Sequence, residues 1–310
     1  MLFSQKLSHK EAIIRKRRAN CLEKSKYAKI HGARGALSRT ENSQRSEKDV
    51  VRDNLSLSQL SRFENGQTML SADRMLLAIS GIHMSFAEFG HALNNYKETP
   101  YFAAGKKIME LYGKQDVEGL KGLLEEYKNY ESREIYNRLN LLVIKDCIHS
   151  LESSYTIDQE EINLLTKYLY DIEEWTEYEL YLFGNTLTLL STEDLLFLGK
   201  AFVERDKLYR SIPSHDNAAK LALLNIISVL LERKQTYYVS YFMEILEKLL
   251  THQDMYFIAI LNFFKLVIKC TEGEKQADQE LEDFLSALEL IGNPALVETL
   301  KAKQRQLLSA

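Results

Sequence analysis

The sequence contains few of the residues that interrupt helices or cross-link chains. Among 310 residues there are 13 Gly, 3 Pro and 3 Cys. So few turn-forming residues argue against a protein of many short strands, which needs a turn at the end of each strand. Cys21, Cys147 and Cys270 are far apart and form no CxxC pair, which excludes a disulfide framework and a zinc finger. We expect an all-α protein with free thiols.

Long apolar runs are also absent. No stretch of about 18 uncharged apolar residues, the length that crosses a bilayer, occurs in the chain. The first residues, "MLFSQKLSHKEAIIRKRR", lack the apolar segment and the small-residue cleavage site of a secretory signal. These absences predict a cytoplasmic protein without a membrane partner.

The common motifs of catalysis and metal binding are missing as well. There is no Gly-rich phosphate loop, HExxH, GxSxG or EF-hand loop, and the seven His are scattered. An isolated histidine such as His149 is more often a structural residue than a ligand. We therefore predict a protein that is not an enzyme, with no cofactor and no metal site. The rival is an enzyme with an unrecognised helical site.

What the chain does have is an uneven distribution of charge. Residues 1–74 carry 16 Lys and Arg against 8 Asp and Glu, a net charge of +8, which leaves −12 for residues 75–310. A basic head on an acidic body indicates that only the head meets a polyanion such as double-stranded DNA. Residues 1–29, with "RKRR" at 15–18, form a basic N-terminal arm. The alternative is that these charges are only a solvated tail.

Four short helices are predicted between residues 46 and 96. "SEKDVVRDN" and "SLSQLSRFENGQ" suggest two helices joined by a tight turn, with Ser46 and Ser56 as N-caps. The helix that starts at Ser56 should turn Leu60 and Phe63 towards the domain interior and end at "NG". We take residues 30–96 as a helix-turn-helix DNA-binding domain.

Two further helices complete this domain. "SADRMLLAIS" begins at a cap-like Ser71 and is expected to bury the face that holds Met75, Leu76 and Ile79. "SFAEFGHALNNY" begins with a capping box of Ser85 and Glu88, and its apolar stripe consists of Phe86, Phe89 and Leu93. Pro100 follows at the natural boundary.

In a helix-turn-helix the second helix lies in the major groove and reads bases with the residues at its start and one turn later. Ser56, Leu57, Ser58 and Arg62 occupy these positions in "SLSQLSRFENGQ". Arg suits a bidentate contact with guanine, and Ser hydroxyls can contact bases or phosphates. The alternative is an ordinary surface helix with one polar side.

Residues 97–310 are almost continuously helical in pattern, and the pattern repeats. Four apolar helices each contain an Asn before an apolar run, at Asn140, Asn185, Asn225 and Asn262, with spacings of 45, 40 and 37 residues. Such periods are typical of an α-solenoid of helix pairs of the tetratricopeptide or HEAT kind, here in a degenerate form. The intervening segments supply the second helix of each pair; in one, Val239, Phe242, Leu246 and Leu249 share a face.

The four asparagines suggest a binding face. Asn is a poor helix former and is costly to bury unpaired, so each one needs a partner. An extended peptide along the concave face of the solenoid would supply such partners. Further contacts would come from Tyr178, Tyr181 and Arg138, the last of these to a carboxylate. The alternative is that each Asn bonds a neighbouring helix carbonyl or water.

The stretches "SEKDVVRDNLSLSQLSRFENGQ", "SADRMLLAISGIHMSFAEF" and "EEWTEYELYLFGNTLTLLSTEDLLFLGK" resemble the Rgg/GadR/MutR regulators of Gram-positive bacteria. The resemblance implies a cytoplasmic, homodimeric transcriptional regulator, controlled by a short hydrophobic signalling peptide in quorum sensing. It implies that residues 97–310 form a degenerate tetratricopeptide-like helical domain for regulation and dimerisation. It also implies that Ser56, Leu57, Ser58 and Arg62 face the DNA groove. The sequence departs from the family in its first helix, "GARGALSRTENSQR", which is degenerate. A shifted start site or an upstream frame error would also explain this departure.

A protein-binding scaffold is the rival interpretation. In this case the solenoid binds partner proteins, and the degenerate head no longer reads DNA specifically.

Overall fold

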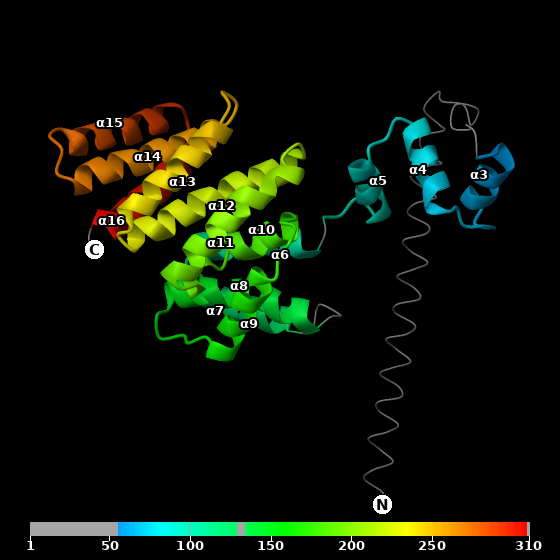
Figure 1. The fold of residues 1–310 in the computed structure, drawn as a ribbon, viewed down its shortest axis with the longest axis horizontal. Coiled ribbons are helices and arrows are strands. Elements are labelled where there is room, and N and C mark those ends of the chain that lie inside the picture. Colours follow the sequence, from blue (N-terminus) through cyan, green and yellow to red (C-terminus); the bar gives the residue numbers. More distant parts are fainter. Residues whose placement is uncertain (1–54, 99, 129–133, 309–310) are drawn as a thin grey trace, which may run out of the picture. The chain divides into compact units, whose positions relative to one another are not determined.

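The computed structural model describes residues 55–98, 100–128 and 134–308, and these residues form fourteen α-helices and two short 3-10 helices (Figure 1). No strand occurs among the described residues, and the expected all-α class is confirmed. No described helix has the length and apolar character needed to cross a membrane. The predicted arm at 1–29, the degenerate first helix and the helix from Ser46 lie outside the described residues.

The chain divides into two compact units, residues 1–106 and 107–310. The described part of the first unit contains three short helices, which are α3 (Leu57–Glu64), α4 (Ala72–Gly81) and α5 (Phe86–Leu93). They pack around one small core, formed by Leu55, Leu60, Phe63, Ala78, Ile79, Ile82, Phe89 and Ala92. Two capping boxes are present, at Ser56 with Gln59 and, as predicted, at Ser85 with Glu88.

Two residues that we expected in this core are exposed. The side chain of Leu76 is 54% exposed and that of Phe86 is 68% exposed. On α4 the buried positions are Ala78 and Ile79, with Met75 packed beside them. A ten-residue helix buries only one narrow face, and Leu76 follows Met75 by about 100° around the axis, outside that face. The prediction was therefore wrong for Leu76 and Phe86.

The second unit is a repeat of helix pairs. Its helices are α6 (Pro100–Gly113, which crosses the division), α7 (Val117–Tyr127), α8 (Glu134–Leu151), α9 (Gln159–Tyr170), α10 (Glu177–Gly184), α11 (Thr192–Arg205), α12 (Pro213–Glu232), α13 (Thr236–Leu249), α14 (Met255–Thr271), α15 (Ala277–Leu290) and α16 (Pro294–Leu308). The 3-10 helices η1 (Leu187–Leu189) and η2 (Asp206–Leu208) flank α11. One continuous core runs from Ile108 to Leu300.

Alternate helices contact one another in this repeat. We call α8, α10, α12 and α14 the first row, because α10 packs on α8 and on α12, and α12 packs on α14. The intervening helices α9, α11 and α13 form the second row. Its expected core positions Val239, Phe242 and Leu246 are buried. In Figure 1, α12, α13 and α14 run side by side.

Within each row, neighbouring helices approach closely where glycine replaces a larger residue. A Cβ atom at Gly184 of α10 would lie 3.6 Å from the backbone of Ala222 on α12. A Cβ atom at Gly199 of α11 would lie 2.9 Å from the ring of Phe242 on α13. Substitution of Gly199 would therefore overpack the second row.

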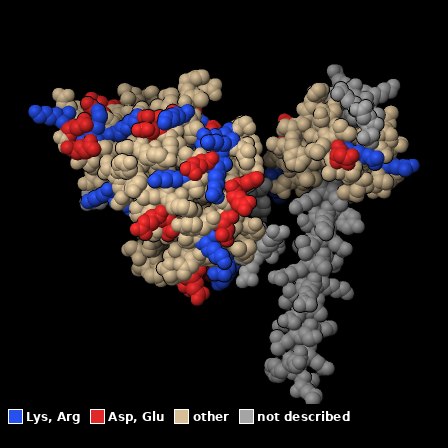
Figure 2. Space-filling view, in the orientation of Figure 1, with Lys and Arg blue, Asp and Glu red and all other residues tan. Residues whose placement is uncertain are grey.

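The surface of the second unit carries both signs of charge. In Figure 2, Lys and Arg side chains are interspersed with Asp and Glu over this face. Many of them pair across helices, as Lys107 does with Glu126 at 2.9 Å and Lys269 with Glu280 at 3.0 Å. Exposed pairs of this kind contribute little to stability, about 0–1 kcal/mol each.

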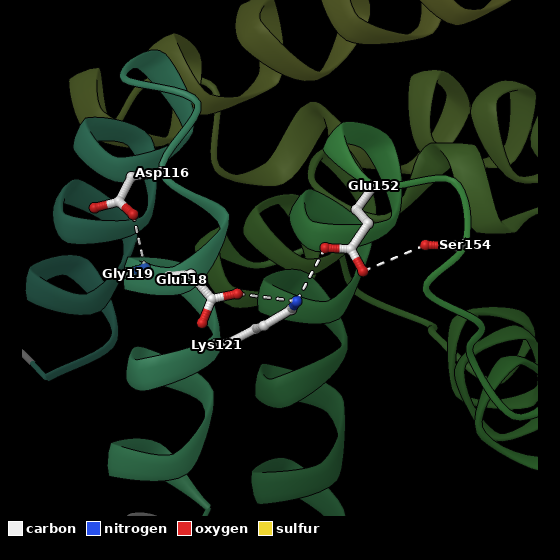
Figure 3. Close-up of polar contacts among 6 residues, drawn as sticks. All are labelled: Asp116, Glu118, Gly119, Lys121, Glu152 and Ser154. Carbon is white, nitrogen blue, oxygen red and sulfur yellow. Dashed lines mark hydrogen bonds and ion pairs between the residues drawn. The ribbon is translucent and has the colours of Figure 1, made fainter.

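The start of α7 shows how local sequence sets a helix end (Figure 3). Asp116 is the N-cap, and its carboxylate accepts the backbone N–H of Gly119 at 2.8 Å. Lys121 on the same helix pairs with Glu118 at 3.2 Å and with Glu152, which follows α8, at 2.9 Å. The cap fixes where α7 starts, and the ion pair between Lys121 and Glu152 connects α7 to the end of α8.

We expect opposite effects from alanine at the two glycines of α7. A Cβ atom at Gly119 would lie 2.5 Å from the capping carboxylate of Asp116 and 2.7 Å from the side chain of Leu111, whereas nothing lies within 4 Å of one at Gly122. Gly119→Ala should disturb the cap and lower the free energy of unfolding by about 1 kcal/mol. Gly122→Ala, the matched control, should raise it by up to about 1 kcal/mol through helix propensity. Urea unfolding curves measure both; equal effects would show that the cap is unaffected.

Candidate functional site

Helix α3 begins and ends where its sequence predicts. The Ser56 hydroxyl accepts the backbone N–H of Gln59 at 3.3 Å, and the Gln59 carboxamide accepts the N–H of Ser56 at 3.1 Å. At the other end Asn65 is the C-cap, and Gly66 takes the left-handed conformation, with φ of 77°. These caps fix where the eight-residue helix begins and ends.

The four predicted DNA contacts are exposed on α3 and at its N-cap. Ser56, Ser58 and Arg62 are exposed, and Leu57 is 38% exposed. The inner side holds Leu60 and Phe63, both almost fully buried, as predicted. Because Arg62 lies four residues after Ser58, their side chains lie one above the other.

Arg62 is available for an external ligand. Its guanidinium forms no ion pair or hydrogen bond with any residue that the structure describes. Of the 16 basic residues counted in positions 1–74, only Arg62 and Arg74 fall within the described part. The basic charge that would attract a polyanion therefore comes mainly from residues outside the described part.

The second set of predicted residues follows the first row of the repeat. Asn140 is on α8, Asn225 on α12 and Asn262 on α14. Asn140 accepts a hydrogen bond at 3.2 Å from the hydroxyl of Tyr178 on α10, so the structure brings these two predicted residues together. Asn225 and Asn262 are exposed.

Asn185 differs from the prediction, because it does not lie inside a helix. Helix α10 ends at Gly184, and Asn185 is its C-cap. Its carboxamide donates to the carbonyl of Tyr181 at 2.7 Å, and the next residue, Thr186, donates to that of Leu182 at 2.8 Å. These two polar side chains take carbonyls that a continuing helix would bond, so the helix stops here.

Asn225 connects this helix end to the neighbouring helix. Its carboxamide nitrogen donates to the carbonyl of Gly184 at 2.9 Å. The carboxamide nitrogens of Asn185 and Asn225 thus each donate a hydrogen bond to a carbonyl at the end of α10. Their oxygens accept no hydrogen bond from the residues that the structure describes, and both side chains are exposed.

The other predicted contacts are spread out. Asn262 forms no hydrogen bond with the described residues. Tyr181 is half-buried at the end of α10, beside Asn185. Arg138 lies two residues from Asn140 on α8, which places the two side chains about 200° apart around the helix axis. The structure therefore does not bring Arg138 to the face that holds Asn140.

An aromatic cluster beside Asn140 was not predicted from the sequence. The ring of Tyr136 lies edge-on to those of Tyr178, at 5.5 Å, and Tyr168, at 6.3 Å. The Tyr168 hydroxyl donates to Glu179 at 2.9 Å. Burial and this carboxylate raise the pKa of Tyr168, so it stays a neutral donor. The three tyrosines come from three different helices, so their spacing along the chain carried no signal of the cluster.

A second unpredicted group surrounds the segment between α10 and α11. Arg233, the C-cap of α12, donates to the carbonyls of Thr188 at 3.1 Å and Leu190 at 2.9 Å. The Thr188 hydroxyl donates to the carboxylate of Asp146 on α8. Asp146 is only 6% exposed, and its burial raises the pKa from 3.8 to about 6. No group of three or more His, Cys, Asp or Glu in the described residues could hold a metal ion.

Together these features define a class of protein in which a small helical head with an exposed, capped helix precedes a repeat of helix pairs. Polar side chains follow one row of this repeat. Residues 120–302 match the family described as "HTH-type transcriptional regulator Rgg, C-terminal domain", which is more than half of the chain. The chain belongs to the Rgg family of transcriptional regulators, which is not a family of enzymes.

Solved structures share this fold at low identity. The SHP pheromone receptor Rgg2 of Streptococcus dysgalactiae is 23% identical, with a TM-score of 0.72, over 89% of this chain and 99% of that one. A protein from Listeria monocytogenes EGD-e, provisionally described as a transcriptional regulator, is 17% identical, with a TM-score of 0.73, over 90% and 97%. PrgX in its complex with iCF10 is 14% identical, with a TM-score of 0.64, over 90% and 96%.

Proposed function

We propose that the protein is a DNA-binding transcriptional regulator that acts as a homodimer in the cytoplasm and is controlled by a short peptide. In this proposal α3 reads base edges, and the exposed carboxamides of the first row bind the peptide backbone. The observation that carries the proposal is the pairing of an exposed, capped α3 with an Rgg-type repeat in one chain. Two of the solved structures with this fold are described as a pheromone receptor and a pheromone/receptor complex.

DNA binding rests on the geometry of α3. Arg62 and Ser58 project from one side, at the spacing of one helical turn, and that side is not needed for the core. Phosphate contacts from the basic head would provide salt-dependent affinity, and Arg62 would provide sequence discrimination. Two such helices related by a two-fold axis imply an operator that is close to a palindrome.

Arg62→Ala should reduce discrimination between operator and random DNA by about tenfold, because a bidentate contact to guanine is lost. Binding isotherms at several salt concentrations, with the upstream region of the regulator's own gene as the operator, measure this ratio. Arg74→Ala is the matched control, since it removes one positive charge from the same unit and should weaken both DNAs equally. Equal losses on both DNAs for Arg62→Ala would remove this residue from base readout. The absence of sequence preference in the wild type would favour a protein-binding scaffold.

Peptide binding rests on the orientation of the carboxamides. Asn185 and Asn225 each donate a nitrogen to a protein carbonyl, which holds their oxygens in position. A backbone N–H of an extended peptide can donate to such an oxygen. This arrangement recognises the peptide main chain and leaves side-chain preference to neighbours such as Tyr181. Asn140, Tyr178 and Asn262 would extend the same face; Arg138 would need a separate contact.

Asn225→Ala should weaken peptide binding by about fivefold to tenfold, because one hydrogen bond is worth about 1 kcal/mol. A panel of short apolar synthetic peptides, drawn from small reading frames beside the gene, serves as the probe in calorimetric titrations. Asn163→Ala, on the second-row helix α9, is the control and should leave the affinity unchanged. Unchanged titrations for Asn225→Ala and Asn185→Ala would exclude the proposed face.

A further inference from the structure

The segment between α10 and α11 leaves α-helical geometry beside the exposed Asn185. Residues 185–191 contain a C-cap, the 3-10 helix η1 and an extended Leu190. Their carbonyls therefore lack the regular partners of an α-helix, and side chains must supply them. Leu187 and Leu190 anchor the segment in the core, each with 2% exposure.

Side chains from two neighbouring helices hold this segment at several points. On the α12 side, the Asn225 carboxamide donates a hydrogen bond to the carbonyl of Gly184. Eight residues later, the Arg233 guanidinium donates hydrogen bonds to the carbonyls of Thr188 and Leu190. On the α8 side, the carboxylate of Asp146 accepts a hydrogen bond from the hydroxyl of Thr188. The planar guanidinium suits this role because its donors have a fixed geometry that an ammonium group lacks.

We propose that Asp146 and Arg233 act as positioning residues: they clasp the segment between α10 and α11 and so hold Asn185 beside Asn225. The clasp consists of hydrogen bonds within the repeat and does not depend on a peptide. Only its effect on peptide affinity rests on the proposed function. If the clasp opens, Asn185 loses its place relative to α12, so in this proposal Asp146 and Arg233 act on the peptide only through Asn185.

The charge of Asp146 makes the clasp sensitive to pH. The titratable groups that interact with Asp146 are Cys147 and His149 on α8 and Tyr112 on α6. Glu232 of α12, which pairs with Lys303 of α16, interacts with Tyr112. The carboxylate has a raised pKa in the closed clasp, so closing is favoured by protonation. Opening should increase as the pH rises through about 6. Cys147 stays protonated because burial raises its pKa to about 12.

Hydrogen exchange of the backbone amides of Asn185, Thr186, Leu189 and Leu190 tests the clasp, because each donates within this segment or to the end of α10. Arg233→Gln should speed their exchange at least about tenfold, and Arg233→Lys should restore only part of the protection. Amides of α14 should not change. Unchanged exchange in residues 185–190 of both variants would overturn the clasp.

The pH profile separates positioning from a general structural role. From pH 5 to 7 the segment of the wild type should open about tenfold more, after correction for intrinsic exchange, by linkage to Asp146. In Asp146→Asn, which keeps an acceptor for Thr188, this dependence should vanish, while His149→Gln should retain it. A profile that persists in Asp146→Asn would overturn the assignment. This variant also provides a test if Arg233→Gln does not fold.

The link to the peptide face is tested with the same synthetic peptides. Arg233→Gln should weaken binding about tenfold without contact with the peptide. Faster exchange with unchanged affinity would overturn the positioning of Asn185, although the clasp would stand. If the wild type binds no peptide in the panel, the proposed function fails, and the exchange data still decide whether the clasp exists.

Discussion

Replacing Lys220 with methionine should lower the free energy of unfolding by about 3 kcal/mol at pH 7. The Lys220 side chain is 5% exposed, and its ammonium lies 2.6 Å from Asp216 on the same helix and 3.0 Å from Asp254 at the start of α14. Burial alone would lower the pKa of Lys220, but the two carboxylates outweigh this and raise it. Methionine fills a similar volume beside Phe257 and leaves the carboxylates without their cation. Chemical denaturation at fixed pH measures the change.

The same variant has a predictable dependence on pH. Hydrogen bonds from Thr251, and then the bond from Lys220, lower the pKa of Asp254 from 3.8 to about 2. A depressed pKa contributes stability above pH 4, and this contribution is lost as the pH falls towards 2. Without Lys220 the contribution shrinks, so the difference between Lys220→Met and the wild type should be largest near neutral pH and should decrease below about pH 4.

Two controls distinguish a buried ion pair from a general effect of charge removal. Lys269→Met breaks the ion pair with Glu280, in which both side chains are more than 40% exposed. This change should lower the free energy of unfolding by less than about 1 kcal/mol. Asp254→Asn in the Lys220→Met background removes the partly buried carboxylate that lost its partner and should recover part of the loss. A loss in Lys220→Met no larger than that in Lys269→Met would show that the triad is not a significant source of stability.

The sequence was most informative where structure is set by nearby residues. Ser56 with Gln59 and Asn65 with Gly66 define the limits of α3 through contacts within four residues, so these limits could be predicted. The alternation of helix pairs followed from the periodic apolar positions, as at Val239 and Phe242. Family membership also followed from local stretches of sequence, and the family match confirms it.

Contacts between distant residues were not predictable. Asn225 and Gly184 are 41 residues apart, and Arg233 and Thr188 are 45 residues apart. No periodicity indicates which carbonyl lacks a helical partner until the end of α10 is known. The apolar run after Asn185 suggested a continuing helix, but Asn185 and Thr186 bond backward and end it. Local hydrogen bonding therefore overrode the apolar pattern.

The arrangement of the candidate peptide face was predicted only in part. The 37–45-residue spacing placed the asparagines on the first row, because each period adds one helix pair. Which atoms of each carboxamide point outward depends on hydrogen bonds to the end of α10, which only the folded chain defines. Asn225 is held by such a bond, whereas Asn262 has none within the described residues. Within the proposed peptide face, the fold therefore orients the carboxamide of Asn225, and no described residue does so for Asn262.

Asp146→Asn should raise the free energy of unfolding by about 2 kcal/mol at pH 7.5. Burial raises the pKa of Asp146 from 3.8 to about 6, so at pH 7.5 the folded protein bears the cost of a buried charge, about 3 kcal/mol. The neutral carboxamide avoids this cost and still accepts from Thr188. The nitrogen of the new carboxamide adds N–H donors that need partners, which reduces the gain in the free energy of unfolding by about 1 kcal/mol. Denaturant unfolding of both proteins measures the difference.

The direction of the pH effect makes this prediction specific to the carboxylate. A raised pKa means that the contribution of Asp146 to stability is complete below about pH 4 and is lost as the pH rises through about 6. The advantage of Asp146→Asn should therefore grow by about 1 kcal/mol between pH 5 and 7.5. Asp194→Asn, in the first turn of α11 beside Ser191, should show no such growth. A constant difference across this range would mean that Asp146 is already neutral, or already solvated, in the folded protein.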